Sequence, residues 1–178
     1  MYLFKICTCL TFVIRVKREM PRRGKPKQRK VQPDPIYKNR LVTKLINRSM
    51  RDGKKTVTQR QVYRAFEMIK EKTDDDPVKA FSQAISNIKP TMEVKPRRIG
   101  GAAYQIPMSV RGSRRESLAI RWLIFAARAR PNSQYHTYAE KLAAEIMDAA
   151  KREGGAVKKR VEMERLAEAN RAFAHFRW

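Results

Sequence analysis

The stretch KPRRIGGAAYQIP, from Lys95 to Pro107, decides the kind of fold that this chain adopts. Apolar and polar residues alternate on both sides of Gly100 and Gly101, which is the pattern of two strands whose successive side chains point to opposite faces. A Gly-Gly pair supplies the positive φ angles that a tight hairpin turn requires. Pro107 has no amide proton to give to a ladder, so its strand must lie at a sheet edge. We therefore predict a two-stranded β-hairpin at about 92–110.

The segments on either side of the hairpin have helical periodicity instead. Six runs repeat apolar residues with the 3.6-residue period of amphipathic helices. In the last run, Val157, Val161 and Leu166 are expected to face the core. The predicted fold is mainly α, a six-helix bundle-like body with one protruding two-stranded β-hairpin. The runs cover about 35–52, 56–72, 76–89, 113–130, 133–152 and 156–172.

Three helix starts carry local signals. Asp34 and Asp76 each precede a proline, which is the order of an N-cap residue followed by a first-turn proline. Ser113 and Glu116 have the S-x-x-E spacing of a capping box, in which each side chain accepts a hydrogen bond from the other residue's backbone. We therefore expect these residues to begin the first, third and fourth helices.

Composition divides the chain into three parts. Residues 1–19 hold an apolar run that is too short to span a bilayer and is followed by charges rather than by a signal-peptide cleavage site. We interpret them as an extension outside the fold, upstream of a plausible alternative start at Met20. Residues 20–34 form a basic arm with several prolines, which we expect to bind RNA. Residues 35–178 form a single helical domain that includes the hairpin.

Charge is the strongest guide to function. The chain has 41 Lys and Arg against 17 Asp and Glu, a net charge of +24. A compact protein with this charge repels itself unless a polyanion neutralises it, and nucleic acid is the first expectation. The candidate phosphate-binding cations are Arg22, Arg23, Lys25, Lys27, Arg29, Lys30, Lys54, Lys55, Lys95, Arg97, Arg98, Arg111, Arg114, Arg115, Lys158, Lys159 and Arg160.

Tyr104, near the predicted hairpin tip, has two alternative roles. Its ring can stack on a base or a ribose. It can also pack across the strands against Val94 or Pro96.

No pattern indicates an enzyme, a metal or a cofactor. The sequence has no phosphate-binding loop of the P-loop type, no H-E-x-x-H and no G-x-S-x-G. Its two histidines, His136 and His175, are interpreted as a surface residue and a packed or stacked residue. Cys7 and Cys9 are the only cysteines and cannot complete a four-ligand zinc site.

Four stretches together point to a family. They are QPDPIYKNRLVTKLINRSMRDGKK, VKPRRIGGAAYQIPMSV, RRESLAIRWLIFAAR and the pair GGAVKKR and AEANRAFAHFRW. From Met20 to Trp178 the chain closely resembles the family of small-subunit ribosomal protein seven, of bacterial or organellar type. The resemblance implies a helical body with a protruding β-ribbon and a structural, non-enzymatic role without a cofactor. It also implies a location in cytoplasmic ribosomes, or in an organellar matrix or stroma.

The resemblance further implies a set of partners. The family binds the 3′ major domain of the small-subunit ribosomal RNA and nucleates assembly of the subunit head. The cations named above would then hold ribosomal RNA. The family's ribbon approaches exit-site tRNA and messenger RNA, and the protein touches ribosomal protein eleven of the small subunit. We expect a monomer outside the ribosome and no membrane partner. The tip that would face tRNA and messenger RNA consists of Gly100, Gly101, Ala102, Ala103 and Tyr104.

Two other interpretations remain open from the sequence. An architectural DNA-binding protein also combines a helical body with basic β-ribbon arms, but such arms usually insert an apolar wedge, and the tip here is small. A membrane-surface protein could be anchored by residues 1–19.

Overall fold

The computed structural model describes residues 31–73 and 76–176. These residues belong to one compact unit that begins at Val31. The extension at 1–19 and most of the basic arm lie outside the described residues, so the predictions for them stay predictions. The arm cations in question are Arg22, Arg23, Lys25, Lys27, Arg29 and Lys30.

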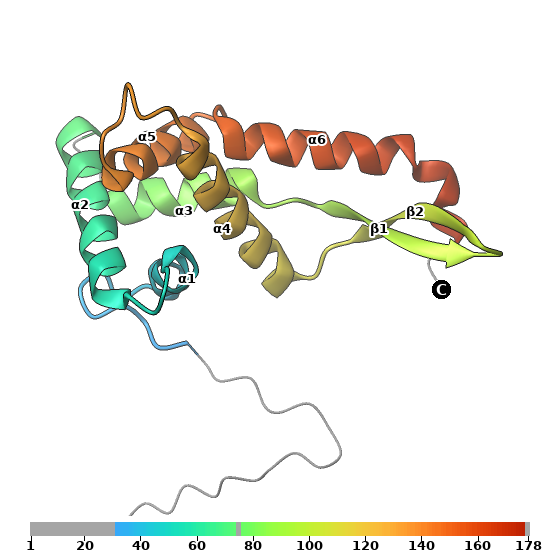
Figure 1. Cartoon of the computed structure of the whole chain (residues 1–178), viewed down its shortest axis with the longest axis horizontal. Coiled ribbons are helices and arrows are strands. Elements are labelled where there is room, and N and C mark those ends of the chain that lie inside the picture. The colour runs from blue at the N-terminus through green and yellow to red at the C-terminus, as the bar shows by residue number, and fades with distance from the viewer. Residues whose placement is uncertain (1–30, 74–75, 177–178) are drawn as a thin grey trace, which may run out of the picture. The chain divides into compact units, whose positions relative to one another are not determined.

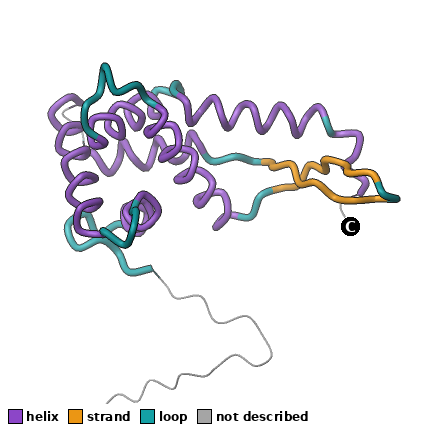
Figure 2. Tube along the Cα trace, in the orientation of Figure 1, coloured by secondary structure: helices purple, strands orange, loops and turns teal. Residues whose placement is uncertain are grey.

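The described chain is mostly helical and contains one hairpin, which confirms the predicted fold class (Figures 1 and 2). The hairpin extends away from the gathered helices, and α6 runs along it (Figure 1). In chain order, the elements are α1 (Arg40–Ser49), α2 (Lys55–Thr73), α3 (Pro77–Ile88), β1 (Met92–Ile99), β2 (Ala102–Ser109), α4 (Gly112–Ala129), α5 (Tyr138–Ala150), α6 (Gly155–Ala169) and the 3-10 helix η1 (Arg171–Phe176).

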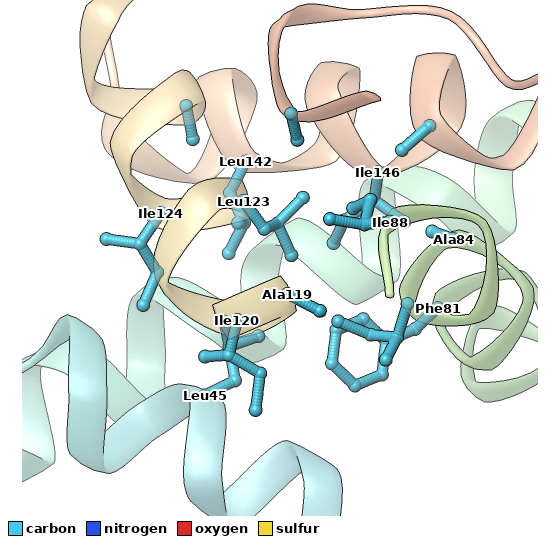
Figure 3. Close-up of a cluster of buried hydrophobic side chains, with 14 of the residues drawn as sticks. Leu45, Phe81, Ala84, Ile88, Ala119, Ile120, Leu123, Ile124, Leu142 and Ile146 are labelled. Carbon is cyan, nitrogen blue, oxygen red and sulfur yellow. The ribbon is translucent and has the colours of Figure 1, made fainter. Parts of the chain in front are cut away.

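One hydrophobic core joins the helices. Leu123 of α4 and Leu142 of α5 are fully buried, as is Phe81 of α3, and Figure 3 shows these side chains converging with those of neighbouring helices. Phe66 of α2 joins Phe81 with the ring centroids 5.6 Å apart. Burying one such side chain stabilises the fold by about 1.5–3 kcal/mol. The core therefore fixes the helices that carry the hairpin.

The prediction that Asp34 begins the first helix is wrong, and the prediction that Asp76 caps the third helix is confirmed. Asp76 caps α3, because its Oδ1 accepts a hydrogen bond from the Val78 amide at 3.2 Å. Asp34 does not begin a helix, since α1 starts only at Arg40 and Asn39 caps it. The Asp34 carboxylate is buried and accepts a hydrogen bond from the Tyr63 hydroxyl of α2 at 2.9 Å. Asp34 Oδ2 also accepts hydrogen bonds from the Ile36 and Tyr37 amides at 3.3 Å, so Asp34 caps a short turn that does not continue into a helix.

The predicted capping box of α4 is also wrong. Arg111 is the N-cap residue, without a side-chain hydrogen bond, and Ser113 lies inside the helix. Glu116 instead contacts Lys44 of α1 at 2.6 Å. A capping box does occur at the start of α5, where Thr137 and Glu140 satisfy each other's backbone amides. That helix therefore begins at Tyr138 rather than near Ser133.

Helix α6 packs on the core with Ala156, Val157 and Met163, but not with all the residues predicted to face inward. Val157 is buried as predicted, but Val161 and Leu166 are 49% and 43% exposed, so their predicted inward positions are wrong. The physical reason is visible in Figure 1, where α6 continues past the other helices and runs beside the hairpin.

The hairpin has the predicted turn, and the structure gives its pairing register. Gly100 and Gly101 have φ angles of 56° and 90°, which L-residues rarely adopt. Ile99 pairs with Ala102 across the turn, and Lys95 pairs with Ile106. Because an isolated two-stranded hairpin is marginally stable in water, its contacts with α6 and η1 provide the support that it needs.

Candidate nucleic-acid interface

The base of the hairpin is held by a buried carboxylate. Glu93 of β1 is only 6% exposed, and its Oε2 lies 2.7 Å from Arg114 Nε at the start of α4. Lys95 Nζ lies 3.1 Å from the other oxygen. Burial alone would raise the pKa of Glu93, but the hydrogen bonds from Arg114 and Lys95 outweigh it and hold the pKa below its ordinary value. Of these two predicted RNA-binding cations, Arg114 of α4 fixes the hairpin to the body, whereas Lys95 pairs with Glu93 within β1.

The outer half of the hairpin is held by aromatic contacts that the sequence analysis missed. The ring centroid of Tyr104 lies 5.3 Å from that of Phe173 and 6.0 Å from that of Phe176, both in η1. The predicted packing against Val94 or Pro96 is wrong, because Tyr104 pairs with Arg97 and so projects from the opposite face of the sheet. Tyr104 thus connects the hairpin to the C-terminal segment.

The tip of the hairpin is small and exposed. Gly100, Gly101, Ala102 and Ala103 are all exposed, and a Cβ added at either glycine would meet nothing within 4 Å. Arg98 is exposed on the strand that leads to the turn. The tip can therefore approach a partner's backbone closely, with a cation beside it.

The remaining predicted cations divide into exposed and partnered groups. Lys54 and Lys55 are exposed where α1 joins α2, as is Arg111 before α4. Arg115 donates a hydrogen bond from Nε to the Val110 carbonyl at 3.0 Å, and Arg97 is half-buried. Among the described residues, the predicted cations therefore differ in exposure and in their partners.

The cations at the start of α6 are balanced by acids of the same helix. Lys159 lies 2.7 Å from Glu162, and Arg160 lies 3.7 Å from Glu164. Lys158 is exposed. This segment has less uncompensated positive charge than its sequence, VKKR, indicates.

A second basic surface, largely missed from the sequence, follows α4. Arg114, Arg121 and Arg128 recur every seven residues, which is about two helical turns, so they lie on one face. This face is exposed and α4 contributes no acidic residue to it, although Arg114 at its start pairs with Glu93 of β1. Arg121 makes no hydrogen bond or ion pair with the described residues. The seven-residue spacing was a readable signal for Arg121 and Arg128, which were not predicted as site residues.

Helix α1 lies beside α4 and extends this surface. Arg128 donates a hydrogen bond to the Ser49 carbonyl at 2.9 Å, which joins the end of α1 to α4. A groove of about 440 Å³ opens at this junction, and no carboxylate is among its lining residues. We name the exposed cations Arg51, Lys54, Arg121 and Arg128 the α1–α4 basic surface.

The groove is held in shape by a network below it. Lys141 is 9% exposed and donates hydrogen bonds to the Arg130 carbonyl at 2.6 Å and to Asn132 at 2.5 Å. Arg130 in turn contacts Glu145 and Asp148 of α5. His136 lines the groove at an exposed position, as predicted for a surface residue.

Comparison with known proteins gives the family. The model of the ribosomal protein S7p/S5e family matches residues 21–171. The chain belongs to this family. The small ribosomal subunit protein uS7 of Carboxydothermus hydrogenoformans is 56% identical over 159 residues, 89% of this chain and all of the relative. The proteins of the same name from Thermodesulfovibrio yellowstonii and Moorella thermoacetica are each 57% identical over the same shares.

Membership of the family confirms the resemblance found in the sequence. It makes the chain a structural protein of the small ribosomal subunit that takes part in translation, and not an enzyme. Within residues 31–73 and 76–176 no helix is long and apolar enough to cross a membrane.

Proposed function

We propose that this chain binds the 3′ major domain of the small-subunit ribosomal RNA and thereby nucleates assembly of the subunit head. The family match and the names of the relatives support a place in the small subunit. The observation that carries the RNA contact is the pair of exposed arginines Arg121 and Arg128 on one face of α4, a face to which α4 itself contributes no acidic residue.

The cations have two tasks in this proposal. Arg121, Arg128 and Lys54 are exposed and hold phosphates, for which the planar guanidinium of arginine is suited because it can bind two oxygens at once. Arg114 and Arg115 mainly fix the hairpin, because Glu93 and the Val110 carbonyl accept their hydrogen bonds. The other predicted RNA-binding residues, including the arm at 20–34 and those at 158–160, add long-range attraction.

We also propose that the hairpin tip from Gly100 to Ala103 approaches exit-site tRNA and messenger RNA. The small tip and the exposed Arg98 support a close approach to a nucleic-acid backbone. The two attachments of the hairpin, Glu93 to Arg114 and Tyr104 to Phe173, support a fixed reach. We also propose that the chain contacts ribosomal protein eleven of the small subunit and that it is a monomer outside the ribosome. The bacterial sources of the relatives support cytoplasmic ribosomes over organellar ones.

Chemical footprinting tests this function directly. The full chain is mixed with a transcript of the 3′ major domain from Thermodesulfovibrio yellowstonii, whose own protein is 57% identical to this one. We expect protection of a limited set of nucleotides that persists in excess duplex DNA. Protection that DNA abolishes at equal concentration would mean general polyanion binding and would contradict the proposal.

A further inference from the structure

Phe125 is the most exposed of the large apolar side chains in the described part of the chain, at 68%. It lies in the middle of α4, and its immediate neighbours Leu123, Ile124, Ala126 and Ala127 are all buried. The core of α4 is therefore complete without it. A single exposed apolar side chain is common on protein surfaces, so the cationic neighbours of Phe125 decide what its ring can bind.

The surroundings of Phe125 are cationic. Arg121 precedes it by one turn and Arg128 follows it by one turn, and both are exposed on the same helix face. At a rise of about 1.5 Å per residue the two arginines stand about 10 Å apart along the helix axis, with the ring between them. An aromatic ring between two cations matches a base between two phosphates, which is how proteins hold unpaired nucleotides.

We propose that Phe125 is a stacking platform for an unpaired base of the ribosomal RNA, and that Arg121 and Arg128 bind the phosphates on either side of that base. This inference rests on the proposed function and assigns one of its contact points. Arg128 donates a hydrogen bond to the Ser49 carbonyl, and this bond orients the Arg128 side chain before RNA binds.

Charge favours RNA over a protein as the occupant. The exposed face of α4 consists of Arg114, Ser117, Arg121, Phe125 and Arg128 and has no acidic residue. A protein that docked on the ring would have to desolvate these arginines or supply carboxylates at each of them. An RNA strand brings one phosphate per nucleotide and a flat base to match the ring.

Substitutions at Phe125 separate stacking from simple apolar contact. Phe125→Trp keeps an aromatic face, whereas Phe125→Leu keeps apolar surface without one. Because the side chain is exposed, none of these variants should disturb the core. Leu166→Ala, at an exposed apolar position on α6, is the matched control. The measurement is the affinity of each variant for the Thermodesulfovibrio yellowstonii 3′ major domain transcript, relative to wild type. Phe125→Trp and the control should stay within about twofold of wild type, whereas Phe125→Leu should bind about fivefold or more weakly.

Ultraviolet cross-linking gives a second, independent measurement. Irradiation of the complex, followed by trypsin, should yield a nucleotide adduct on the peptide 122–128, with fragment ions locating it at Phe125. Equal affinity for wild type and Phe125→Leu, with no adduct at Phe125, would overturn this inference alone. Failure of wild type to distinguish the ribosomal transcript from unrelated RNA of equal length would overturn the proposed function and this inference together.

Discussion

Arg114 Nε lies 2.7 Å from Oε2 of Glu93, and this ion pair joins the first strand of the hairpin to the first turn of α4. Lys95 shares the same carboxylate from the strand itself. This ion pair fixes the direction in which the hairpin leaves the helical body. That direction depends on the buried carboxylate of Glu93 remaining paired with Arg114.

Removal of Arg114 should destabilise the protein more than removal of a neighbouring cation. Arg114→Ala leaves the buried Glu93 carboxylate with Lys95 alone, which should cost about 1–2 kcal/mol of unfolding free energy after allowance for the half-exposed arginine. Arg111→Ala, at an exposed residue of the same junction, should cost less than about 0.5 kcal/mol. Urea denaturation measures both. Equal losses would show that the ion pair does not fix the hairpin.

Acid should weaken the same attachment. The pKa of Glu93 is lower in the folded protein than in the unfolded chain, where it is about 4.3. Its contribution to stability is therefore complete above the unfolded value and is lost as the pH falls through the folded value. The stability difference between wild type and Glu93→Gln should be constant from pH 7 to pH 5 and shrink below about pH 4. A difference that grows on acidification would contradict this assignment.

Phe173→Ala should loosen the outer hairpin without unfolding the body. An aromatic pair contributes about 0.5–1.5 kcal/mol beyond the area it buries, so the amides of β2 near Tyr104 should exchange with solvent about two- to tenfold faster. Amides of α3 and α5 in the core should keep their protection. Arg171→Ala, an exposed residue of the same 3-10 helix, is the control. Unchanged exchange in β2 would mean that η1 does not support the hairpin.

Glu145 should be among the most costly polar residues to replace. It is 1% exposed, contacts Arg130 at 2.7 Å, and accepts a hydrogen bond from the Ala156 amide at the start of α6 at 2.9 Å. Glu145→Ala removes both contacts and leaves Arg130 with Asp148 as its one carboxylate partner among the described residues, so we expect a loss of about 3–5 kcal/mol. Glu153→Ala, at an exposed position, should be nearly neutral in the same thermal or urea unfolding experiment. A small effect of Glu145→Ala would show that α6 is held by its apolar contacts.

The sequence predicted elements well where one local rule decided the conformation. Gly100 and Gly101 form the predicted turn because few other residues adopt their φ angles, and Asp76 caps α3 because Pro77 follows it. Asp34 carries the same local signal as Asp76, yet the hydroxyl of Tyr63 binds it. Such a tertiary contact is not encoded in neighbouring residues.

The candidate site was predictable only in part. Clustered cations such as Lys54 and Lys55 stand out in the sequence, whereas Arg121 and Arg128 are found only when their helical spacing is read. The ion pair of Lys159 with Glu162 has the i,i+3 spacing of a helix pair and was also readable. The ion pair of Glu93 with Arg114 was not, because it depends on how β1 packs against α4. The role of Tyr104 was missed because its partners in η1 lie far along the chain.

The most direct test of the central claim is the salt dependence of binding to the 3′ major domain transcript. The wild-type chain is compared with Arg51→Ala/Arg121→Ala on the α1–α4 basic surface and with Lys79→Ala/Lys151→Ala, which removes the same charge from exposed positions elsewhere. If both arginines hold phosphates, the first double variant should reduce the slope of log affinity against log salt by about 1.4–1.8. The second should leave the slope nearly unchanged. Equal reductions by the two double variants would show that net charge, and not the α1–α4 basic surface, binds the RNA.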